Sequence, residues 1–342
     1  MILRMPRYCS DFKCTADKCT DNCCIGWEID IDDDTLGYYR SVDGEFGKKL
    51  TENINLGETA SFKLSKNDRC PFLNDRNLCD IFTELGEEHL CQICTDHPRY
   101  FEWFKGVKEG GTGLGCEESA RIIITQDRKF TFMETEIPDD DCEDYSDELY
   151  DFLCSARERI ITHLQNRSLT VSERIADVLS YAEELQYRSD NDDFRLPDIV
   201  RDPERKLPDS EKLLTFFQEL EPLDPGRPDY LKHCISLYEK VKNNSDSFLM
   251  NTPEMERYLE NIAVYFIWRY FMKGVFSGEF YSYVFLTAAS VTVIRYLCEC
   301  FYLENNALTE KDVIRIAKEY SKETEYSDDN VNAVLDFAYN YN

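Results

Sequence analysis

Positive charge is scarce in this sequence. Its 342 residues include 39 lysines and arginines against 67 aspartates and glutamates, a formal net charge of −28. Nucleic-acid binding needs a basic surface to neutralise phosphates, so we expect no nucleic-acid partner. Residues 1–135 hold 17 basic and 25 acidic side chains, so most of the negative charge follows them. That later part is the one expected to attract a lysine-rich protein, because opposite charges steer association.

Long apolar runs are also missing. No uninterrupted run reaches the ~18 residues of a membrane-spanning helix. The best candidate, 284–301, contains Arg295 and Glu299 and is interpreted as a buried helix of a soluble protein. The segment from Met1 to Arg7 lacks the apolar core of an export signal, so we expect a cytoplasmic protein without membrane insertion.

Cysteine, in contrast, is abundant. Of the 15 cysteines, ten lie between Cys9 and Cys116. In a reducing compartment such density favours metal binding over disulfides, and an odd number fits poorly with complete pairing. Thiolates suit both zinc and iron–sulfur clusters. Cys23 and Cys24 are adjacent, and neighbouring side chains usually diverge, which indicates either two metal sites or a different role for one of the two.

The remaining candidates for metal binding are weaker. His97 precedes a proline, and a histidine in that position can simply pack or cap. The later cysteines lie in helical or linker context and are interpreted as small buried hydrophobic residues: Cys142, Cys154, Cys234, Cys298 and Cys300.

The order of the early cysteines resembles that of a known family. The pattern opens with Cys14, Cys19 and Cys23-Cys24-Ile-Gly-Trp27, continues with Cys70-Pro-Phe-Leu73 and Cys79, and closes with Cys94-x-x-His-Pro-Arg99 and Cys116-x-Glu118. It is similar to the flagellin lysine-N-methylase family, within the wider group of proteins with a zinc- or iron-chelating Cys-x-x-Cys-x-x-Cys-Cys domain. The resemblance is strongest over the first third of the chain, and the segment 258–271 is similar in character to the family's C-terminal half.

The resemblance implies a function, cofactors and ligands. The implied function is methyl transfer from S-adenosylmethionine to lysine ε-amino groups of flagellin or a similar lysine-bearing protein. The implied metal group is an iron–sulfur cluster, expected to be of the 4Fe-4S type, with zinc as the alternative. Cys9 and Cys91 fall outside the implied ligand set. That set comprises Cys14, Cys19, Cys23, Cys24, Cys70, Cys79, Cys94 and Cys116.

Two other functions stay open, because related cysteine-rich sequences occur widely. One is a non-catalytic cytoplasmic metal-binding adaptor, and the other is an enzyme that modifies another peptide or protein. The Cys-x3-Cys-x2-Cys spacing of radical S-adenosylmethionine enzymes is absent, since Cys24 directly follows Cys23. We therefore expect a neutral lysine amine to attack the methyl group directly, with the cluster in a structural or orienting role. Free lysine has a pKa of about 10.4, so the site must lower it or supply a base, which the sequence does not identify.

Two further motifs have ordinary explanations. The segment 110–115, Gly-Gly-Thr-Gly-Leu-Gly, lacks the G-x-G-x-x-G spacing of a dinucleotide-binding loop. We interpret it as a turn that brings Cys116 to the metal. The acidic run from Asp30 to Asp34 could attract a cationic substrate, but a strand-to-helix turn with an aspartate as N-cap is the commoner use of such a run.

The fold expected from these patterns is mainly α. Residues 1–135 are predicted to form a loop-rich metal-binding domain with short strands, such as 129–133, and residues 136–342 an all-helical substrate and cofactor domain. Polar connections are expected at 137–144 and 190–208. Thr170 with Glu173, and Thr309 with Asp312, resemble capping boxes. Hydrophobic periodicity predicts helices near 146–165, 171–187, 210–220, 229–243, 253–275, 279–303, 310–323 and 328–341.

One of these helices carries the candidate cofactor site. Asn261, Tyr265 and Arg269 are spaced four residues apart in the helix predicted at 253–275, so they share one face. Polar groups on an aromatic face can line a cofactor or lysine pocket, and tyrosine can hold a sulfonium by a cation–π contact. The competing interpretation is core packing, the commoner role of an aromatic stripe on a helix.

Overall fold

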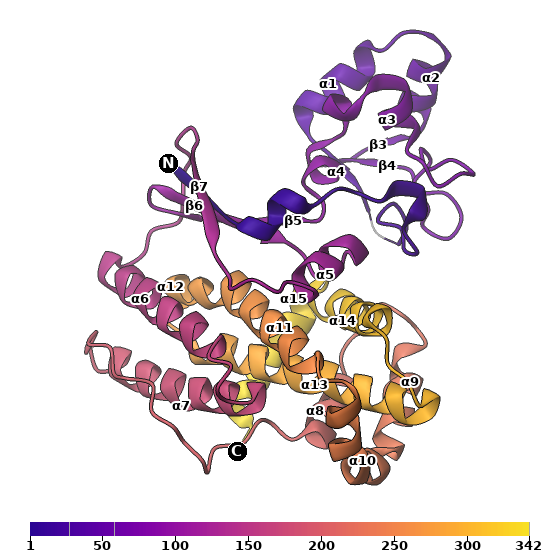
Figure 1. The fold of residues 1–342 in the computed structure, drawn as a ribbon. Helices are drawn as coiled ribbons and strands as arrows, with labels where there is room; N and C mark the ends of the chain where they lie inside the picture. Colours follow the sequence, from indigo (N-terminus) through magenta and orange to yellow (C-terminus); the bar gives the residue numbers. More distant parts are fainter. Residues whose placement is uncertain (27, 58, 342) are drawn as a thin grey trace. The chain divides into compact units, whose positions relative to one another are not determined.

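A computed structural model describes residues 1–26, 28–57 and 59–341, so Trp27 of the cysteine pattern lies outside the described residues. The chain divides into two compact units (Figure 1). The helical unit comprises Met1–Asp11, Phe101–Gly115 and Ser119–Asn342, and the cysteine-rich unit comprises Phe12–Tyr100 and Cys116–Glu118. Segments on both sides of the cysteine-rich stretch thus belong to the helical unit, which differs from the division at residue 135 predicted above.

A four-stranded sheet accounts for this division. Its order is β5-β6-β1-β7, with β1 (Ile2–Pro6) in the interior. β1 runs parallel to β6 (Val107–Thr112) and antiparallel to β7 (Phe132–Glu136), while β5 (Arg99–Phe104) forms one edge. The strand predicted at 129–133 is therefore present a few residues later. Because the backbone groups of β1 pair with strands that follow the cysteine-rich stretch, residues 1–11 fold with the helical unit.

The helices predicted from hydrophobic periodicity after residue 146 are confirmed, and they form a bundle. They are α6 (Asp147–Leu164), α7 (Val171–Ser189), α8 (Ser210–Phe217), α9 (Arg227–Ser236), α10 (Tyr238–Asn251), α11 (Met255–Tyr270), α12 (Gly274–Ser277), α13 (Tyr281–Asn305), α14 (Glu310–Glu325) and α15 (Asp328–Asn340). Two predicted helices are divided. The one at 229–243 breaks at Leu237, which separates α9 from α10 with φ −91° and ψ −1°. The one at 253–275 ends as α11, a 3-10 turn (Phe271–Lys273) and α12.

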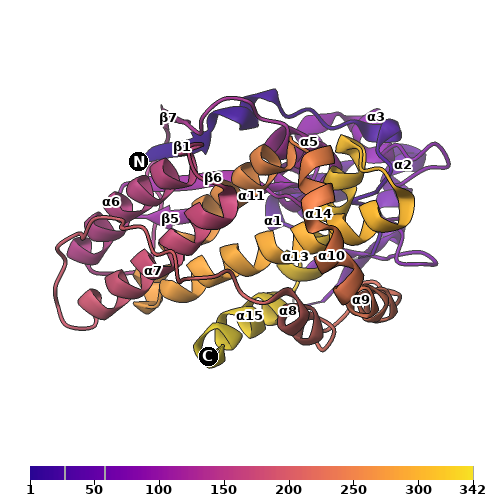
Figure 2. The ribbon, with the colours of Figure 1, turned by 60° about the horizontal axis from the view of Figure 1, so that its bottom comes forward.

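Helix α13 forms the centre of the helical unit. It packs against α7, α8, α10, α11, α14 and α15, and Figure 2 shows it passing between α11 and α15. Within the described part of the chain it is the one helix long and apolar enough to cross a membrane, yet 83% of its apolar window is buried. This burial agrees with the core helix predicted from residues 284–301.

The predicted helix starts are confirmed in detail. The Thr170 hydroxyl accepts a hydrogen bond from the backbone of Glu173, whose carboxylate accepts one from the backbone of Thr170 at 2.8 Å. Thr309 and Asp312 form the same reciprocal arrangement at α14. Both predicted connections, 137–144 and 190–208, lack helices and strands.

The cysteine-rich unit is built from shorter elements around a small core. Its three-stranded sheet has the order β2-β4-β3, and Asp32 caps its first helix by accepting from the backbone of Thr35, as predicted for the acidic run. The core contains Tyr39, Phe62 and Phe72 together with buried Cys70 and Cys91. The elements are η2 (Ala16–Lys18), β2 (Asp30–Ile31), α1 (Asp33–Ser41), α2 (Gly44–Glu52), β3 (Ile54–Leu56), β4 (Ala60–Phe62), α3 (Asp80–Leu85), η3 (Glu87–His89) and α4 (Gln92–Asp96).

Candidate functional site

A pocket of about 500 Å³ lies within the helical unit. Cavities of roughly 300–1,000 Å³ are the usual size for small-molecule sites. Three segments form its walls: the 3-10 helix η1 (Arg7–Asp11), the end of α5 (Glu117–Ile124) with the residues that follow it, and α11. The lining residues are Arg7, Tyr8, Ser10, Asp11, Ile123, Gln126, Arg128, Lys129, Phe130, Thr131, Asn261, Val264 and Tyr265.

Helix α11 holds one wall in place through Asn261. The side-chain amide of Asn261 donates to the carbonyl oxygens of Ile124 (2.9 Å) and Gln126 (2.8 Å). Arg257, one turn earlier on α11, donates to the same Gln126 oxygen at 3.0 Å. Both amide hydrogens of Asn261 are thus used, while its side-chain oxygen has no partner among the described residues. That oxygen is a free hydrogen-bond acceptor in the pocket wall.

Tyr265 is fixed by a buried polar network. Its hydroxyl donates to the Glu325 carboxylate at 2.8 Å and accepts from the Arg269 guanidinium (2.8 Å) and the backbone N–H of Leu114 (3.0 Å). Glu325 also accepts from Tyr270 at 2.9 Å. The Tyr265 hydroxyl is committed to these partners, and the residue forms part of the packed wall of the pocket.

The segment from Gln126 to Phe130, which forms another part of the wall, is anchored on both sides of two exposed cations. Asn261 and Arg257 fix the chain at Gln126, as described above. Phe130 and Phe132 pack on the ring of Trp268, with ring centroids 5.0 and 5.5 Å apart. Arg128 and Lys129 lie between these anchors and line the pocket. The packing of Trp268 therefore sets the position of both cations.

Tyr8 reaches the pocket from η1. The backbone N–H of Arg7 donates to the Thr131 carbonyl at 2.9 Å, so η1 continues directly from the β1–β7 pairing. The Tyr8 hydroxyl is buried and has no hydrogen-bond partner in the described structure. Burial, with smaller contributions from Cys9 and Tyr265, raises the Tyr8 pKa well above its usual value. The hydroxyl therefore stays protonated and can donate a hydrogen bond.

The residues that line the pocket have a net positive charge, although the protein as a whole is strongly acidic. Arg7, Arg128 and Lys129 face one carboxylate, Asp11. None of the three cations makes an ion pair or side-chain hydrogen bond within residues 1–26, 28–57 and 59–341. The protein as a whole has a net charge of −28, so three unpaired cations beside one cavity are a local exception.

The candidate cofactor residues are only partly brought together. Asn261 and Tyr265 line the pocket, whereas Arg269 supports Tyr265 from behind, as a member of the Glu325 network. The competing interpretation, core packing, also applies to this helix: most of its residues are buried, and Tyr265 is only 1% exposed. Sequence periodicity identified neither Tyr8 nor Arg128 and Lys129, because these residues lie outside the α-helices and reach the pocket only through tertiary contacts.

The glycine-rich segment 110–115 contributes to close packing. The carbonyl of Gly110 accepts from the Trp268 indole at 2.9 Å, and Leu114 donates to Tyr265. A Cβ atom on Gly115 would come 2.7 Å from the Tyr326 hydroxyl oxygen. A side chain at this position would have to push the Tyr326 ring aside. The glycines thus allow β6 and the following turn to approach α11, and they do not line the pocket.

Several of the predicted metal-binding cysteines converge in the cysteine-rich unit. Cys24, Cys79 and Cys94 pack against the core that contains Cys70 and Cys91. The Cys91 and Cys94 sulfur atoms are 3.3 Å apart. A hydrogen bond with Cys91, together with burial and the charges of Cys24 and Cys70, raises the pKa of Cys94. Cys91, which the family pattern omits, is therefore at the centre of this group.

The other early cysteines lie elsewhere. The Cys19 sulfur is 4.0 Å from the Glu117 carboxylate, next to Cys116 in the chain. Cys14 and Cys23 are exposed. Cys9 belongs to the helical unit and lies 3.9 Å from the Thr112 hydroxyl. Three of the five later cysteines are buried as predicted, namely Cys234, Cys298 and Cys300.

These cysteines do not form a completed metal site as they stand. Among the described residues, no three Cys, His, Asp or Glu side chains have an arrangement that could hold a metal ion. The chemistry of the convergent group nevertheless fits a soft metal. Burial raises the pKa of the Cys70 thiol to about 11, and a positive metal ion would offset the cost of ionising such thiols. The metal-binding role and the eight-cysteine ligand set remain predictions.

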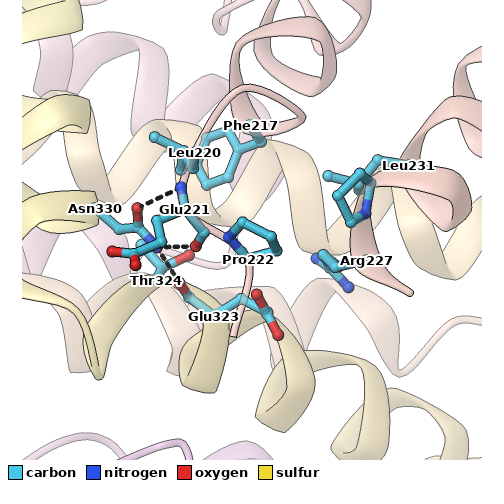
Figure 3. Close-up of a pocket in the computed structure, with 10 residues that line it drawn as sticks. Phe217, Leu220, Glu221, Pro222, Arg227, Leu231, Glu323, Thr324 and Asn330 are labelled. Atoms are coloured by element: carbon cyan, nitrogen blue, oxygen red, sulfur yellow. Dashed lines mark hydrogen bonds between the residues drawn. The ribbon is translucent and has the colours of Figure 1, made fainter. Parts of the chain in front are cut away.

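A second hollow is too small to bind a ligand. It lies between Pro222, Arg227 and Glu323 in the helical unit, and Figure 3 shows Asn330 bridging to the backbone of Glu221 beside it. Its volume is about 10 Å³, which is room for a single water molecule at most.

Comparisons with known proteins agree with the resemblance described above. The family model of the FliB lysine N-methylase C-terminal domain matches residues 157–342. The flagellar biosynthetic protein FliU of Salmonella muenchen is 30% identical over 130 residues, which cover 36% of this chain and 77% of that protein. The lysine-N-methylases of Salmonella choleraesuis and Salmonella typhimurium are each 29% identical over 130 residues. No solved structure matches.

The extent of these matches differs. The aligned region spans 36% of this chain but only 32% of each lysine-N-methylase, so the two enzymes are much longer than the shared part. The family model, in contrast, covers more than half of the chain, including α11 and most of the helices around it. The chain therefore belongs to the FliB lysine N-methylase family.

Proposed function

We propose that this protein methylates lysine ε-amino groups, with S-adenosylmethionine as the methyl donor and flagellin or a similar flagellar protein as the substrate, in the cytoplasm. The observation that carries the proposal is the pocket of about 500 Å³, one wall of which is helix α11. That helix lies inside the region matched by the lysine N-methylase model. The names of the Salmonella relatives, a flagellar biosynthetic protein and two lysine-N-methylases, support the choice of substrate.

The pocket has groups suited to the donor. S-adenosylmethionine supplies an electrophilic methyl group on a positively charged sulfur. Tyr265 lines the pocket with its hydroxyl engaged by Glu325, and a cation–π contact with that positive charge requires the ring, now 1% exposed, to become accessible when the donor binds. The unpaired side-chain oxygen of Asn261 can accept a hydrogen bond from an amino group of the donor. Arg269 keeps Tyr265 in place and has a positioning role.

The acceptor lysine meets the carboxylate of Asp11. Asp11 is exposed at the pocket and pairs with the incoming ε-ammonium group. The lysine nitrogen must release a proton to solvent water before it attacks, since its ordinary pKa is about 10.4. Its lone pair then forms the new N–C bond, while the electron pair of the broken S–C bond stays on sulfur. The acidic surface after residue 135 favours the approach of lysine-rich protein.

The proposed metal group has a structural role. The convergent cysteines, Cys24, Cys70, Cys79, Cys91 and Cys94, are the residues that would hold an iron–sulfur cluster of the 4Fe-4S type, with zinc as the alternative. Bound metal would replace the mutual repulsion of these thiolates with bonds to a cation. A cluster here orders the cysteine-rich unit, and the methyl transfer itself requires no electron from it.

The test is methylation of purified flagellin. The protein, purified without oxygen to preserve a cluster, is incubated with flagellin and S-adenosylmethionine carrying a deuterated methyl group, and lysine peptides are examined by mass spectrometry. Deuterated methyl groups on lysine are the expected result. Binding of the donor without any product on flagellin would redirect the search to another protein substrate. Absence of both donor binding and product would support the non-catalytic metal-binding adaptor.

A variant separates lysine capture from donor binding. Asp11→Asn removes the carboxylate from an exposed position that makes no described ion pair, so folding should be unchanged. We expect a higher KM for flagellin and an unchanged affinity for S-adenosylhomocysteine. Asp151→Asn, at an exposed position on α6, is the matched control for loss of one negative charge. Equal kinetics for the two variants would remove Asp11 from the proposal.

A further inference from the structure

We propose that Arg7, Arg128 and Lys129, together with the Tyr8 hydroxyl, form a binding site for a carboxylate group, namely that of the amino-acid end of the methyl donor. This inference rests on the proposed function, because it assigns to the same pocket the group that its cationic side binds. The residues of this site lie on η1 and in the segment after α5, and both are outside the region covered by the family model.

The charge of the lining is the first argument. Three cations and one carboxylate line the cavity, and no described residue pairs with any of the three cations. Elsewhere in the helical unit, buried cations have carboxylate partners: Arg157 binds Glu109 at 2.5 and 2.6 Å, and Arg174 binds Glu260 at 2.6 Å. In so acidic a protein, unpaired cations around a cavity indicate that the missing anion comes from a ligand.

The fixed backbone is the second argument. Arg128 and Lys129 do not project from a long free loop, because the chain is hydrogen-bonded at Gln126 and packed on Trp268 through Phe130. The backbone of Phe130 also donates to the Gln165 side chain at 3.2 Å. Presenting charges from an anchored backbone lowers the ordering cost of binding.

The Tyr8 hydroxyl is the third and independent argument. A buried hydroxyl without a partner is unfavourable by roughly 1–3 kcal/mol, so such groups are rare unless a ligand completes them. Tyr8 lies in the lining of this cavity, and its hydroxyl, one of the few buried side-chain groups without a partner in the described structure, is reached by a ligand only after a shift of the residues that cover it. As a neutral donor it suits a carboxylate oxygen.

The site also separates the two substrates. The same cations repel a lysine ε-ammonium, so the acceptor approaches on the side of Asp11 and the donor's carboxylate occupies the cationic side. Product S-adenosylhomocysteine retains this carboxylate, whereas methylthioadenosine lacks the whole amino-acid end. These two compounds therefore report on the carboxylate site without any catalysis.

The experiment is calorimetric titration of the full chain with both compounds. We expect Arg128→Gln with Lys129→Gln to weaken S-adenosylhomocysteine binding on the order of 10- to 100-fold, as for loss of charged hydrogen bonds, and to leave methylthioadenosine binding unchanged. The control is Lys206→Gln with Lys240→Gln, which removes two exposed charges that do not line the pocket. An equal loss for both compounds, or the same loss in the control, overturns the carboxylate site.

Tyr8→Phe gives a second, stricter readout. Removing a hydroxyl that has no partner should leave the unfolding midpoint unchanged or slightly higher, while S-adenosylhomocysteine binds about 3- to 10-fold more weakly. A merely structural Tyr8 would show the opposite pattern, with lower stability and unchanged affinity.

The two proposals fail in different ways. Wild-type protein that binds neither compound would remove the donor pocket and the carboxylate site together. Wild-type protein that binds S-adenosylhomocysteine, with the double variant and Tyr8→Phe binding equally well, would overturn only the carboxylate site and leave the proposed function standing.

Discussion

The helical unit buries apolar side chains against one another around α13, whereas in the cysteine-rich unit thiols stand among the core residues. In the first unit, Phe266 on α11, Leu297 on the central α13 and Val313 on α14 are fully buried. In the second, Cys70 and Cys91 occupy comparable positions beside Phe72. The difference teaches that hydrophobic burial alone can hold the first unit together, while the second has replaced part of its apolar core with groups that gain from a metal ion.

The largest expected effect is loss of metal. Cys91→Ser with Cys94→Ser removes the pair of sulfur atoms 3.3 Å apart. We expect iron or zinc content to fall to background and residues 12–100 to become sensitive to protease, while the helical unit stays resistant. Cys142→Ser, in the polar connection, is the control and should retain full metal content. Undiminished metal in the double variant would place the ligands in another group of cysteines.

Truncating one aromatic ring in each unit comes next. Phe266→Ala and Phe72→Ala both remove side chains that are 0% exposed. A large-to-small change in a packed core costs about 3–5 kcal/mol. For Phe266 we expect this loss with or without metal, measured by denaturant unfolding. For Phe72 we expect a larger shift in the metal-free protein than in the loaded one. Identical shifts in both states would mean that metal does not stabilise the cysteine-rich unit.

In metal-free protein, alkaline pH should destabilise the cysteine-rich unit more than the helical unit. Burial raises the Cys70 pKa to about 11 from 9.0, so folding favours the neutral thiol. The stability gained is fully present below pH 9 and is lost as the pH rises from 9 towards 11. The loss is up to about 3 kcal/mol, since one pKa unit corresponds to about 1.4 kcal/mol. Proteolysis at pH 8 and 10 should show the cysteine-rich unit opening first, and Cys70→Ala should reduce the difference, because the pKa of Cys94 is raised as well.

The smallest effect concerns a helix cap in the helical unit. Thr170→Ala removes the hydroxyl that accepts from the Glu173 backbone at the start of α7, at a cost of about 1 kcal/mol. Metal content and ligand binding should not change. Thr170→Ser, which keeps the hydroxyl, is the matched control. A change in metal content with Thr170→Ala would show that the stabilities of the two units are coupled.

Sequence reasoning recovered the helices because periodicity and caps are local. The reciprocal bonds of Thr170 and Thr309 and the buried helix around 284–301 follow from residues close together in the chain. The sheet was not foreseen, because β1 pairs with strands about a hundred residues later in the chain, and no local pattern encodes such pairing. The candidate site was found only on α11. Tyr8 and Arg128 reach it from segments outside the α-helices, where the spacing of residues does not predict which way a side chain points.

The interior position of β1 has a consequence for biosynthesis. The ribosome makes β1 before the cysteine-rich stretch, and makes its partners β6 and β7 afterwards. Domains generally fold as units while synthesis continues. Most of the cysteine-rich unit is therefore synthesised while β1 is still an unpaired strand, the kind of edge that chaperones and aggregation both exploit. Completion of the sheet follows emergence of most of the cysteine-rich segment, so the order of the chain sets the order of assembly.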